Sequence, residues 1–307
     1  MHKKKYISSL LLLLAAIIWG FAFAAQDAAS EMGAFTLGFA RSFIAGVFLI
    51  GVIAVFDKAS GSSRKLFTKR GIDLNRYEII GGVIIGAVLV VASAFQQIGI
   101  NNGTDGGKAA FITALYVILV PIYALALRKK AALNVWISIG IAVVGFYLLC
   151  IKEDLTVAPS DVLVIIASMI FPIHILTIDH FSPKCDGIRM SMVQFFTAAM
   201  LNLVIALAIE GPAELGSIFP SILPVLYLGI GSSGIAYTLQ RIGQKDVPPA
   251  TASIILSLES VFGIIGTALF LGQTLTPREY LGCAIVLVAV ILSQIDIKAI
   301  IKRKDTK

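Results

Sequence analysis

Long apolar stretches recur along the whole chain and are separated by short polar links. A hydrocarbon layer about 30 Å thick is crossed by about 20 apolar residues in a helix. The stretches are too long, and alternate too little, for the strands of a membrane barrel, and helices satisfy their backbone groups within the segment. The pattern predicts an all-α integral membrane protein with ten transmembrane helices, at residues 7–25, 33–56, 79–99, 108–127, 132–151, 162–180, 188–209, 222–243, 250–271 and 279–297.

Composition agrees with a chain that lies almost wholly in lipid. Of its 307 residues, 58% are hydrophobic and 14% are charged, and the mean hydropathy is +0.92. The longest link, residues 57–78, is polar and basic. These numbers leave no room for a sizeable soluble domain.

The distribution of Lys and Arg predicts the orientation. With the N-terminus inside, 21 of these residues fall on the inner side, Arg241 and Lys245 among them, and three on the outer side. Positive charge concentrates in cytoplasmic links, so we expect both termini in the cytoplasm of a cell whose plasma (inner) membrane holds the protein. The net charge of +7 then reflects topology and attraction to anionic lipid, and not nucleic-acid binding.

The N-terminus has a competing interpretation. Lys3–Lys5, an apolar run and Ala22–Ala24 resemble a secretory signal with its cleavage site. The apolar run continues through Trp19 and Phe21, which is longer than such a signal needs. We therefore expect a retained first helix.

Two segments half a chain apart repeat one pattern. Gln96–Pro121 and Gln240–Ile265 both begin with Gln-x-Ile-Gly, cross a polar link and enter a second apolar stretch. Ten spans divide into five and five, which inverts the second copy in the membrane, as in many secondary transporters. We expect one repeat at residues 1–155 and the other at 156–307. The aligned positions differ in chemistry, with Lys108 and Leu115 in one copy and Ala252 and Glu259 in the other.

Several motifs occur in order and at fixed spacing over the whole chain. They are Trp19–Phe23, Arg41–Phe43, Gln97–Gly99, Gly107–Pro121, Tyr237, Gln240, Gln244–Lys245, Pro248, Ala250, Ser257–Glu259, Thr276 and Gly282. Together they resemble the signatures of the drug/metabolite transporter superfamily, in its ten-helix EamA-type branch.

The resemblance implies an architecture and a mode of action. Helices 1–4 and 6–9 would surround a central cavity, helices 5 and 10 would lie at the periphery, and small metabolites would be moved, often exported, by alternating access. Two departures weaken the transfer of detail. This chain has Glu259-Ser260 where the family often has Glu-Pro, which removes an expected helix kink, and Gly272-Gln273 where it often has Gly-Glu.

Glu259 is the sharpest candidate for function. It lies about ten residues into its span, near the middle of the bilayer, where an unpaired carboxylate costs about 2.5–3.5 kcal/mol on insertion scales. Such a group faces a cavity, pairs with a cation or is protonated. The alternatives are a site for a coupling proton or a substrate amine, and a structural pair with another helix.

Two basic residues are candidates for a gate or vestibule. Arg41, inside the second span, could clamp an anionic group, although we favour snorkelling toward the outer interface or pairing with Asp27, Glu31 or another acid. Lys108 opens the fourth span on the outer side, where a helix N-terminus attracts anions. A structural role at the interface is the alternative for Lys108, and the phosphate-loop pattern is not met.

Uncharged hydrogen-bonding and aromatic side chains within the spans are too many for a lipid-facing surface. We expect them to line a partly polar cavity, although a lone buried His such as His174 is more often a helix–helix contact. The candidates for substrate binding or coupling besides Glu259 are Tyr116, His174, Gln97, Gln194, Tyr237, Trp19 and Ser257. Gln96, Thr113, Gln240, Phe23 and Phe111 are further members of this group.

Enzymatic and cofactor motifs are missing from the sequence. Cys150, Cys185 and Cys283 are scattered, with no CxxC spacing, so neither a disulfide nor a metal site is indicated. No catalytic residues, metal ligands or cofactor-binding motif are expected.

The sequence thus favours a secondary transporter, most simply an exporter of an amino acid or related metabolite, driven by a proton or another gradient. A multidrug or cationic-compound exporter is the alternative, and a membrane receptor or enzyme is a third class. The expected partners are a small-molecule substrate, the lipid bilayer and a coupling proton. We expect a monomer or weak dimer.

Overall fold

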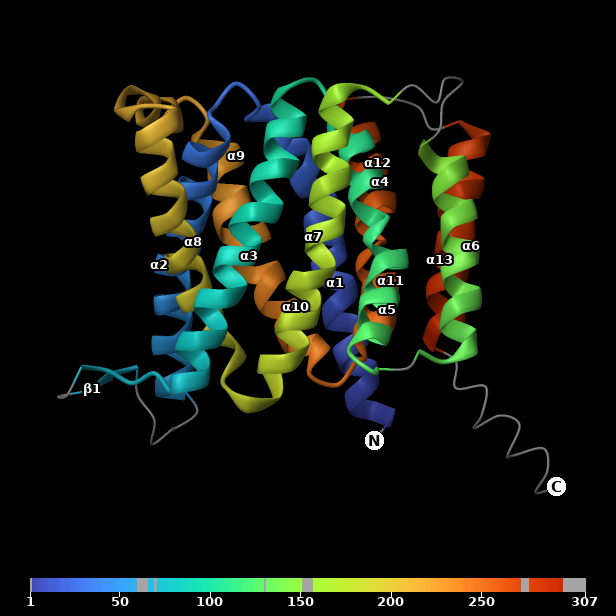
Figure 1. Ribbon diagram of the computed structural model, residues 1–307, viewed down its shortest axis with the longest axis horizontal. Coiled ribbons are helices and arrows are strands. Elements are labelled where there is room, and N and C mark those ends of the chain that lie inside the picture. Colours follow the sequence, from blue (N-terminus) through green and yellow to red (C-terminus); the bar gives the residue numbers. More distant parts are fainter. Residues whose placement is uncertain are drawn as a thin grey trace.

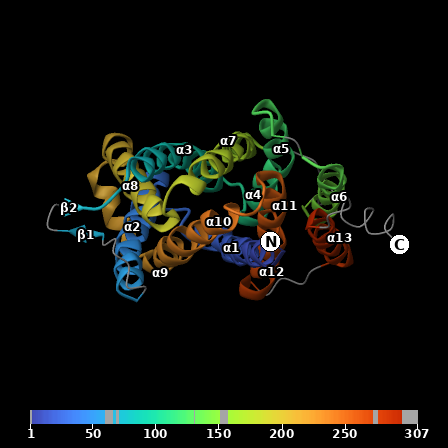
Figure 2. The ribbon, with the colours of Figure 1, turned by 90° about the horizontal axis from the view of Figure 1, so that it is seen from below.

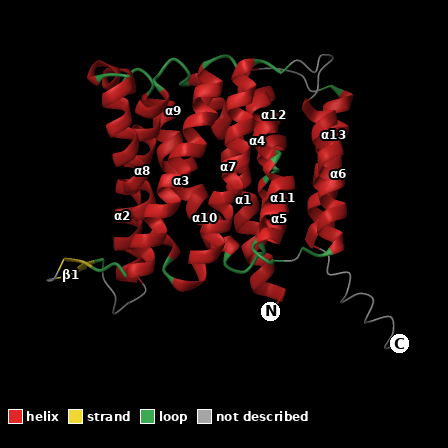
Figure 3. Cartoon of the chain, in the orientation of Figure 1, coloured by secondary structure: helices red, strands yellow, loops and turns green. Residues whose placement is uncertain are grey.

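A computed structural model describes residues 2–59, 66–68, 71–129, 131–150, 157–271 and 276–294 of the chain. Its helices lie side by side along one direction, and their ends form two faces (Figures 1 and 3). We call the end at which the first helix begins the inner end, and the opposite one the outer end.

Helices account for nearly all of the described chain. The first half contains α1 (His2–Ala28), α2 (Ala34–Ala59), α3 (Arg76–Asn101), α4 (Gly106–Ala114), α5 (Tyr116–Ala126) and α6 (Leu133–Cys150). The second half contains α7 (Pro159–Phe181), η1 (Ser182–Lys184), α8 (Gly187–Ile209), η2 (Pro212–Ile218), α9 (Ile222–Leu226), a π-helical segment η3 (Tyr227–Ala236), α10 (Tyr237–Gln244), α11 (Pro249–Leu256), α12 (Glu259–Leu271) and α13 (Pro277–Gln294).

Several of these helices stack end to end and act as single spans. Counted this way, eight helical segments of the described chain are long and apolar enough to cross a membrane, and α4–α5, α9–α10 and α11–α12 are three of them. Two further apolar helices are shorter, Leu133–Leu148 in α6 and Tyr280–Ser293 in α13. The expectation of a multi-pass helical membrane protein is confirmed at this level.

A small hairpin lies in the polar link after α2. Strands β1 (Phe67–Thr68) and β2 (Gly71–Ile72) pair antiparallel, with Phe67 opposite Ile72. The Asp57 carboxylate accepts a hydrogen bond from the Leu66 backbone N–H at 2.8 Å, which ties the hairpin to the end of α2. The expected all-α chain therefore contains one short extended element.

Viewed along the helices, the bundle has two layers (Figure 2). One layer contains α3 and α7, and the other contains α1 and α10, with α2 and α8 packed against each other at one side. The stacked helices α4–α5 and α11–α12 lie toward the other side. The pair α6 and α13, the fifth and tenth spans of the sequence, packs together at the far edge.

The first helix of each half packs in the other half. Helix α1 contacts α10, α11 and α12, and α7 contacts α3, α4 and α5. Helices α1 and α7 run in opposite directions between the inner and outer ends (Figure 1). The two halves are therefore interlocked, and the space between the layers receives side chains from both.

Small residues let these helices approach closely. A Cβ at Gly86 of α3 would lie 2.6 Å from the backbone oxygen of Gln194, and one at Gly82 would lie 2.6 Å from Cβ of Val193 on α8. In α1, a Cβ at Gly20 would collide with Cβ of Phe262 and lie 2.8 Å from the Glu259 backbone oxygen. Close approach through small residues is the usual way in which membrane helices pack.

We predict that Gly20→Ala lowers the free energy of unfolding by about 1–3 kcal/mol, because overpacking forces α1 away from α12. Gly51→Ala is the matched control. Gly51 is also helical, and nothing lies within 4 Å of an added Cβ there. Thermal unfolding of the purified protein measures both changes. Equal effects of the two substitutions would contradict the close packing at Gly20.

Candidate functional site

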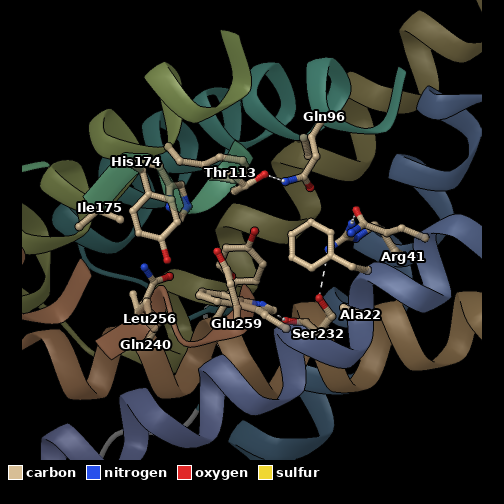
Figure 4. Close-up of a pocket in the computed structure, with 17 residues that line it drawn as sticks. Ala22, Arg41, Gln96, Thr113, His174, Ile175, Ser232, Gln240, Leu256 and Glu259 are labelled. Atoms are coloured by element: carbon tan, nitrogen blue, oxygen red, sulfur yellow. Dashed lines mark hydrogen bonds between the residues drawn. The ribbon is translucent and has the colours of Figure 1, made fainter. Parts of the chain in front are cut away.

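A small cavity of about 50 Å³ lies between the two layers of the bundle (Figure 4). Most of its lining side chains are buried. Seventeen residues line it: Trp19, Ala22, Phe23, Gln26, Arg41, Ser93, Gln96, Thr113, Tyr116, Phe171, His174, Ile175, Ser232, Tyr237, Gln240, Leu256 and Glu259.

Both halves of the chain contribute to this wall, largely through equivalent helices. The first half supplies residues from α1, α2, α3, α4 and α5, and the second supplies them from α7, η3, α10, α11 and α12. This follows from the interlocked packing, which places α1 and α7 on opposite sides of the space between the layers.

Two helix interruptions meet at the cavity. Helix α4 ends at Ala114 and α5 begins at Tyr116, while α11 ends at Leu256 and α12 begins at Glu259. Near both breaks the backbone forms tighter i to i+3 hydrogen bonds, from Leu115 N–H to the Ile112 carbonyl and from Leu258 N–H to the Ile255 carbonyl, each at 3.2 Å. The Gln-x-Ile-Gly repeat aligns Leu115 with Glu259, so the two breaks fall at nearly equivalent positions.

The break at Glu259 occurs without a proline. From the sequence, the change from Glu-Pro to Glu-Ser is expected to remove a kink, and the structure corrects this expectation. The Ser257 hydroxyl donates to the Ile254 carbonyl at 2.8 Å, a side-chain bond that weakens regular helix. The Ser260 hydroxyl donates to the Ala110 carbonyl of α4 at 3.1 Å and thereby joins the two interrupted spans.

The Glu259 carboxyl faces the cavity and is only 5% exposed. Its Oε1 atom has no hydrogen-bond partner of good geometry among the described residues. The Tyr116 hydroxyl lies beside it, and it too lacks a well-placed partner there. A buried carboxyl with an unpaired oxygen is costly in a membrane interior, so it is the part of the wall best suited to bind a proton or a cationic group.

Arg41 brings a positive charge to the same cavity from α2. Its guanidinium donates to the Ser233 hydroxyl at 3.1 Å, the Ser232 hydroxyl at 3.3 Å and the Gln26 side-chain oxygen at 3.4 Å. These partners are uncharged side chains, and neither Asp27 nor Glu31 is among the hydrogen-bond partners of Arg41 in the described part of the chain. Figure 4 shows Arg41 and His174 toward opposite ends of the cavity, with Glu259 between them.

Aromatic rings hold the cavity wall in place. The Trp19 indole N–H donates to the Ser232 carbonyl at 3.2 Å, and its ring meets Tyr237 edge-on with centroids 4.7 Å apart. Tyr237 also makes edge contacts of 5.6 Å with His174 and with Phe195. Because Tyr237 touches rings from α1, α7 and α8, it fixes the relative positions of the two layers.

The structure therefore brings six of the ten candidate residues to one cavity: Glu259, Tyr116, His174, Tyr237, Trp19 and Arg41. Four others lie elsewhere. Gln97 donates to the Gln26 carbonyl and to Asn101, Ser257 is used at the helix break, and Gln194 is fully buried in α8 outside the cavity wall. Lys108 is paired with Asp161 at 2.6 Å at the outer end, with its side chain 37% exposed.

Several residues of the site escape sequence reasoning. Gln26 and Ser232 lie on the wall without a charge or motif to mark them, although Gln26 is seven residues, two helical turns, beyond Trp19.

The position of Arg241 in the structure corrects an expectation from the sequence. Its position suggests a solvent-facing cytoplasmic charge, but its side chain is 1% exposed, because α10 packs between α1 and α8. Gly272 and Gln273, the second family departure, lie outside the described residues.

Contacts join the two layers at both ends of the bundle. At the outer end Gln97 donates to the Gln26 carbonyl and Asn101 donates to the Met32 carbonyl, at 3.3 and 2.8 Å. At the inner end the Gln244 side chain of α10 donates to the Ile175 carbonyl of α7 at 3.2 Å.

A charged network adds to the closure at the inner end. Arg189 of α8 forms a bidentate pair with Asp57 at 2.7 Å and a second pair with Asp186 at 3.1 Å. The Asp186 N–H in turn donates to Glu78 at 3.1 Å. This network joins the ends of α2, α3 and the α7–α8 link.

The described residues contain no group of three or more His, Cys, Asp or Glu arranged to hold a metal ion. The chemistry that the wall offers is hydrogen bonding, one carboxyl, one guanidinium and several aromatic faces.

Comparisons with known proteins agree with this arrangement. A sequence profile of the EamA-like transporter family matches residues 7–151 and 158–294. The chain is similar to an uncharacterized transporter of Archaeoglobus fulgidus, with 27% identity over 291 residues that cover 94% of this chain and 86% of the relative. A crystal structure of a protein, 16% identical, has the same fold, with a TM-score of 0.74 over 94% of this chain and 96% of the other. The protein is a membrane transporter, and the expected kinship is confirmed: the chain belongs to the EamA-like transporter family.

Proposed function

We propose that this protein is a secondary active transporter that carries a small metabolite, an amino acid or a related compound, out of the cell by alternating access. The observation that carries the proposal is the buried Glu259 carboxyl, which faces the cavity at one of two matched helix breaks. The two inverted repeats are residues 1–155 and 156–307, with ten transmembrane helices, both termini in the cytoplasm and the inner end of the bundle facing it.

The chemistry of the wall supports an amino acid as the substrate class. Glu259 suits an amine or a proton, and Arg41 suits a carboxylate. Aromatic faces at Trp19 and Tyr237 suit the apolar part of a small molecule. A zwitterion with an apolar side chain complements all three.

The alternative, export of lipophilic cations, needs the same carboxyl but gains nothing from Arg41. A guanidinium in the wall repels a cation, and its partners Ser232, Ser233 and Gln26 are all uncharged. This observation favours the zwitterion. A receptor or enzyme gains no support from the cavity, because its polar groups form no reactive constellation.

Glu259 is also the proposed site of the coupling proton. Substrate and proton would compete for, or share, the one buried carboxyl of Glu259. Neutralisation of this carboxylate would lower the free-energy cost of switching the access of the cavity from one side of the membrane to the other. Retention of the first helix is part of this account, because Trp19, Phe23 and Gln26 of α1 line the cavity.

We predict that Glu259→Gln reduces pH-driven amino-acid flux in proteoliposomes by at least tenfold and removes its dependence on the pH gradient, because the variant keeps the shape but cannot bind the proton. Glu31→Gln, at an exposed acid of the outer end, is the control and should transport normally. Unchanged flux and pH dependence in Glu259→Gln would refute the coupling role. Counterflow of a lipophilic cation without counterflow of amino acids would favour the alternative substrate class.

A second prediction concerns closure of the inner end. Burial, with a smaller contribution from Glu78, raises the pKa of the Cys185 thiol to about 11, and Sγ contacts the Phe181 carbonyl at 3.3 Å. At pH 7.5 the thiol is therefore protonated and shielded, and a maleimide should label it slowly in a Cys150→Ser, Cys283→Ser background. Arg189→Gln removes the pair with Asp57 and should accelerate labelling several-fold.

The control for the labelling experiment is Arg76→Gln, at an exposed arginine at the same end of the bundle. It should leave the rate unchanged. Rapid labelling of Cys185 before any substitution, or equal rates in the Arg189→Gln and Arg76→Gln variants, would show that the charged network does not hold the inner end closed.

A further inference from the structure

Arg241 lies buried below the cavity without a partner. Its side chain is 1% exposed, and none of its three guanidinium nitrogens has a hydrogen-bond partner among the residues that the structure describes. Tyr237, four residues earlier in α10, lines the cavity, so Arg241 lies on the same helix face one turn closer to the inner end.

The acidic side chains nearest to this position are engaged elsewhere. Glu78 accepts hydrogen bonds from the backbone N–H groups of Asn75 and Asp186. Asp186 accepts from the N–H groups of Ile188 and Arg189 and pairs with the Arg189 guanidinium. Asp57 holds the other side of Arg189 at 2.7 Å. Within the described chain, no carboxylate is hydrogen-bonded to the Arg241 guanidinium.

Other buried polar atoms without partners gather on the helices around Arg241. A Cβ at Gly187 of α8 would lie 3.6 Å from Cβ of Arg241, so this face of α8 meets α10 there. Ser191 and Gln194 follow on the same face, four and seven residues later. The Ser191 hydroxyl and both amide atoms of Gln194 lack partners within the described residues, as does Nε2 of His174, which lies close to Arg241 on α7.

The equivalent position in the first repeat behaves differently. The Gln-x-Ile-Gly alignment places Gln97 where the second copy has Arg241. The Gln97 amide donates to the Gln26 carbonyl at 3.3 Å and to the Asn101 side chain at 2.8 Å. The outer end is therefore closed by contacts within the protein, whereas the inner end carries a charge that the protein leaves unmatched.

A buried polar group without a partner in a native protein calls for an explanation, and a missing ion is one of them. A guanidinium presents a planar fork of donors that matches a carboxylate or phosphate, and Ser, Gln and neutral His add further donors. We propose that Arg241, with Ser191, Gln194 and His174, binds an oxyanion, a carboxylate or phosphate group, between the cavity and the inner end.

The role of this site in transport rests on the proposed function. In that function, the Arg241 site binds the anionic group of a substrate that enters from the cytoplasm. A free inorganic anion, such as phosphate, is the alternative ligand of the Arg241 site. Binding itself is independent of transport, so it can be tested without flux.

The experiment is thermal unfolding of the purified full-length protein with increasing inorganic phosphate, with an amino acid, or with the carboxamide of that amino acid. We expect the melting temperature of the unmodified protein to rise with phosphate, with the amino acid, or with both, but not with the carboxamide. Arg241→Met should weaken this dependence at least tenfold. Without ligand it should melt at the same or a higher temperature, because it removes an unmatched buried charge.

Arg76→Gln is the matched control and should keep the ligand dependence. A shift with phosphate alone would assign the site to free anions, and a shift with the amino acid alone would assign it to the substrate carboxylate. The proposal is overturned if no oxyanion stabilises the unmodified protein, or if Arg241→Met keeps the same ligand dependence. It is also overturned if Arg241→Met unfolds at a lower temperature without ligand and Arg241→Lys does not restore binding.

Stabilisation by phosphate should persist in Glu259→Gln, since Glu259 belongs to the cavity and not to the Arg241 site. If flux proves absent while anion binding depends on Arg241, the proposed function fails and the anion site stands. If flux is present and Arg241→Met leaves both binding and flux unchanged, the anion site fails and the transporter stands.

Discussion

The structure depends on one constraint: polar groups inside a membrane-spanning bundle must be satisfied by the protein or face a cavity. The helices of this chain meet lipid with apolar side chains such as Val47, Val91 and Val204, which are exposed. Their polar side chains turn inward. Because the interior has to hold these groups somewhere, they collect between the two layers, and the cavity with Glu259 and Arg41 is the result.

The interlocked packing supports the proposal that the cavity opens at its two ends in turn. Helices α1 and α7 each lie in the opposite half and run in opposite directions, so both ends of the bundle carry contacts between the two layers. Gln97 and Asn101 connect α3 to α1 and the segment after it at the outer end, and Gln244 connects α10 to α7 at the inner end. Each is a small set of side-chain bonds to backbone carbonyls, which can break without disturbing the packed helices.

Sequence patterns predict much of this fold. The apolar spans, the repeat and the residues that resemble family motifs indicate a helical membrane transporter, because period, length and motif spacing are local properties. The breaks at Leu115 and Ser257–Leu258 cannot be read from the pattern, since they occur without proline inside apolar stretches. The burial of Arg241 also escapes prediction. Whether a charge near a span end meets solvent depends on neighbouring helices that the local sequence does not specify.

The candidate site is also predicted only in part by the sequence. Glu259, Tyr116 and His174 stand out as polar groups in apolar spans, and they do face one cavity. Gln194 and Gln97 carry the same signal and lie elsewhere, because a helix turns polar groups through 100° per residue and only packing decides which face meets the cavity. Lys108 reads as a free vestibule charge, but α7 brings Asp161 to it.

The central claim, that the two ends of one cavity open in turn, is tested most directly by distances between spin labels across the layers. One pair, at Ala28 and Asn102, spans the outer end, and the other, at Lys184 and Lys245, spans the inner end; all four residues are exposed. Distances are measured by pulsed electron resonance at pH 5 and pH 8, with and without a transported amino acid. The account predicts that one distance lengthens while the other shortens. Two distances that change together, or that stay fixed under every condition, would contradict it.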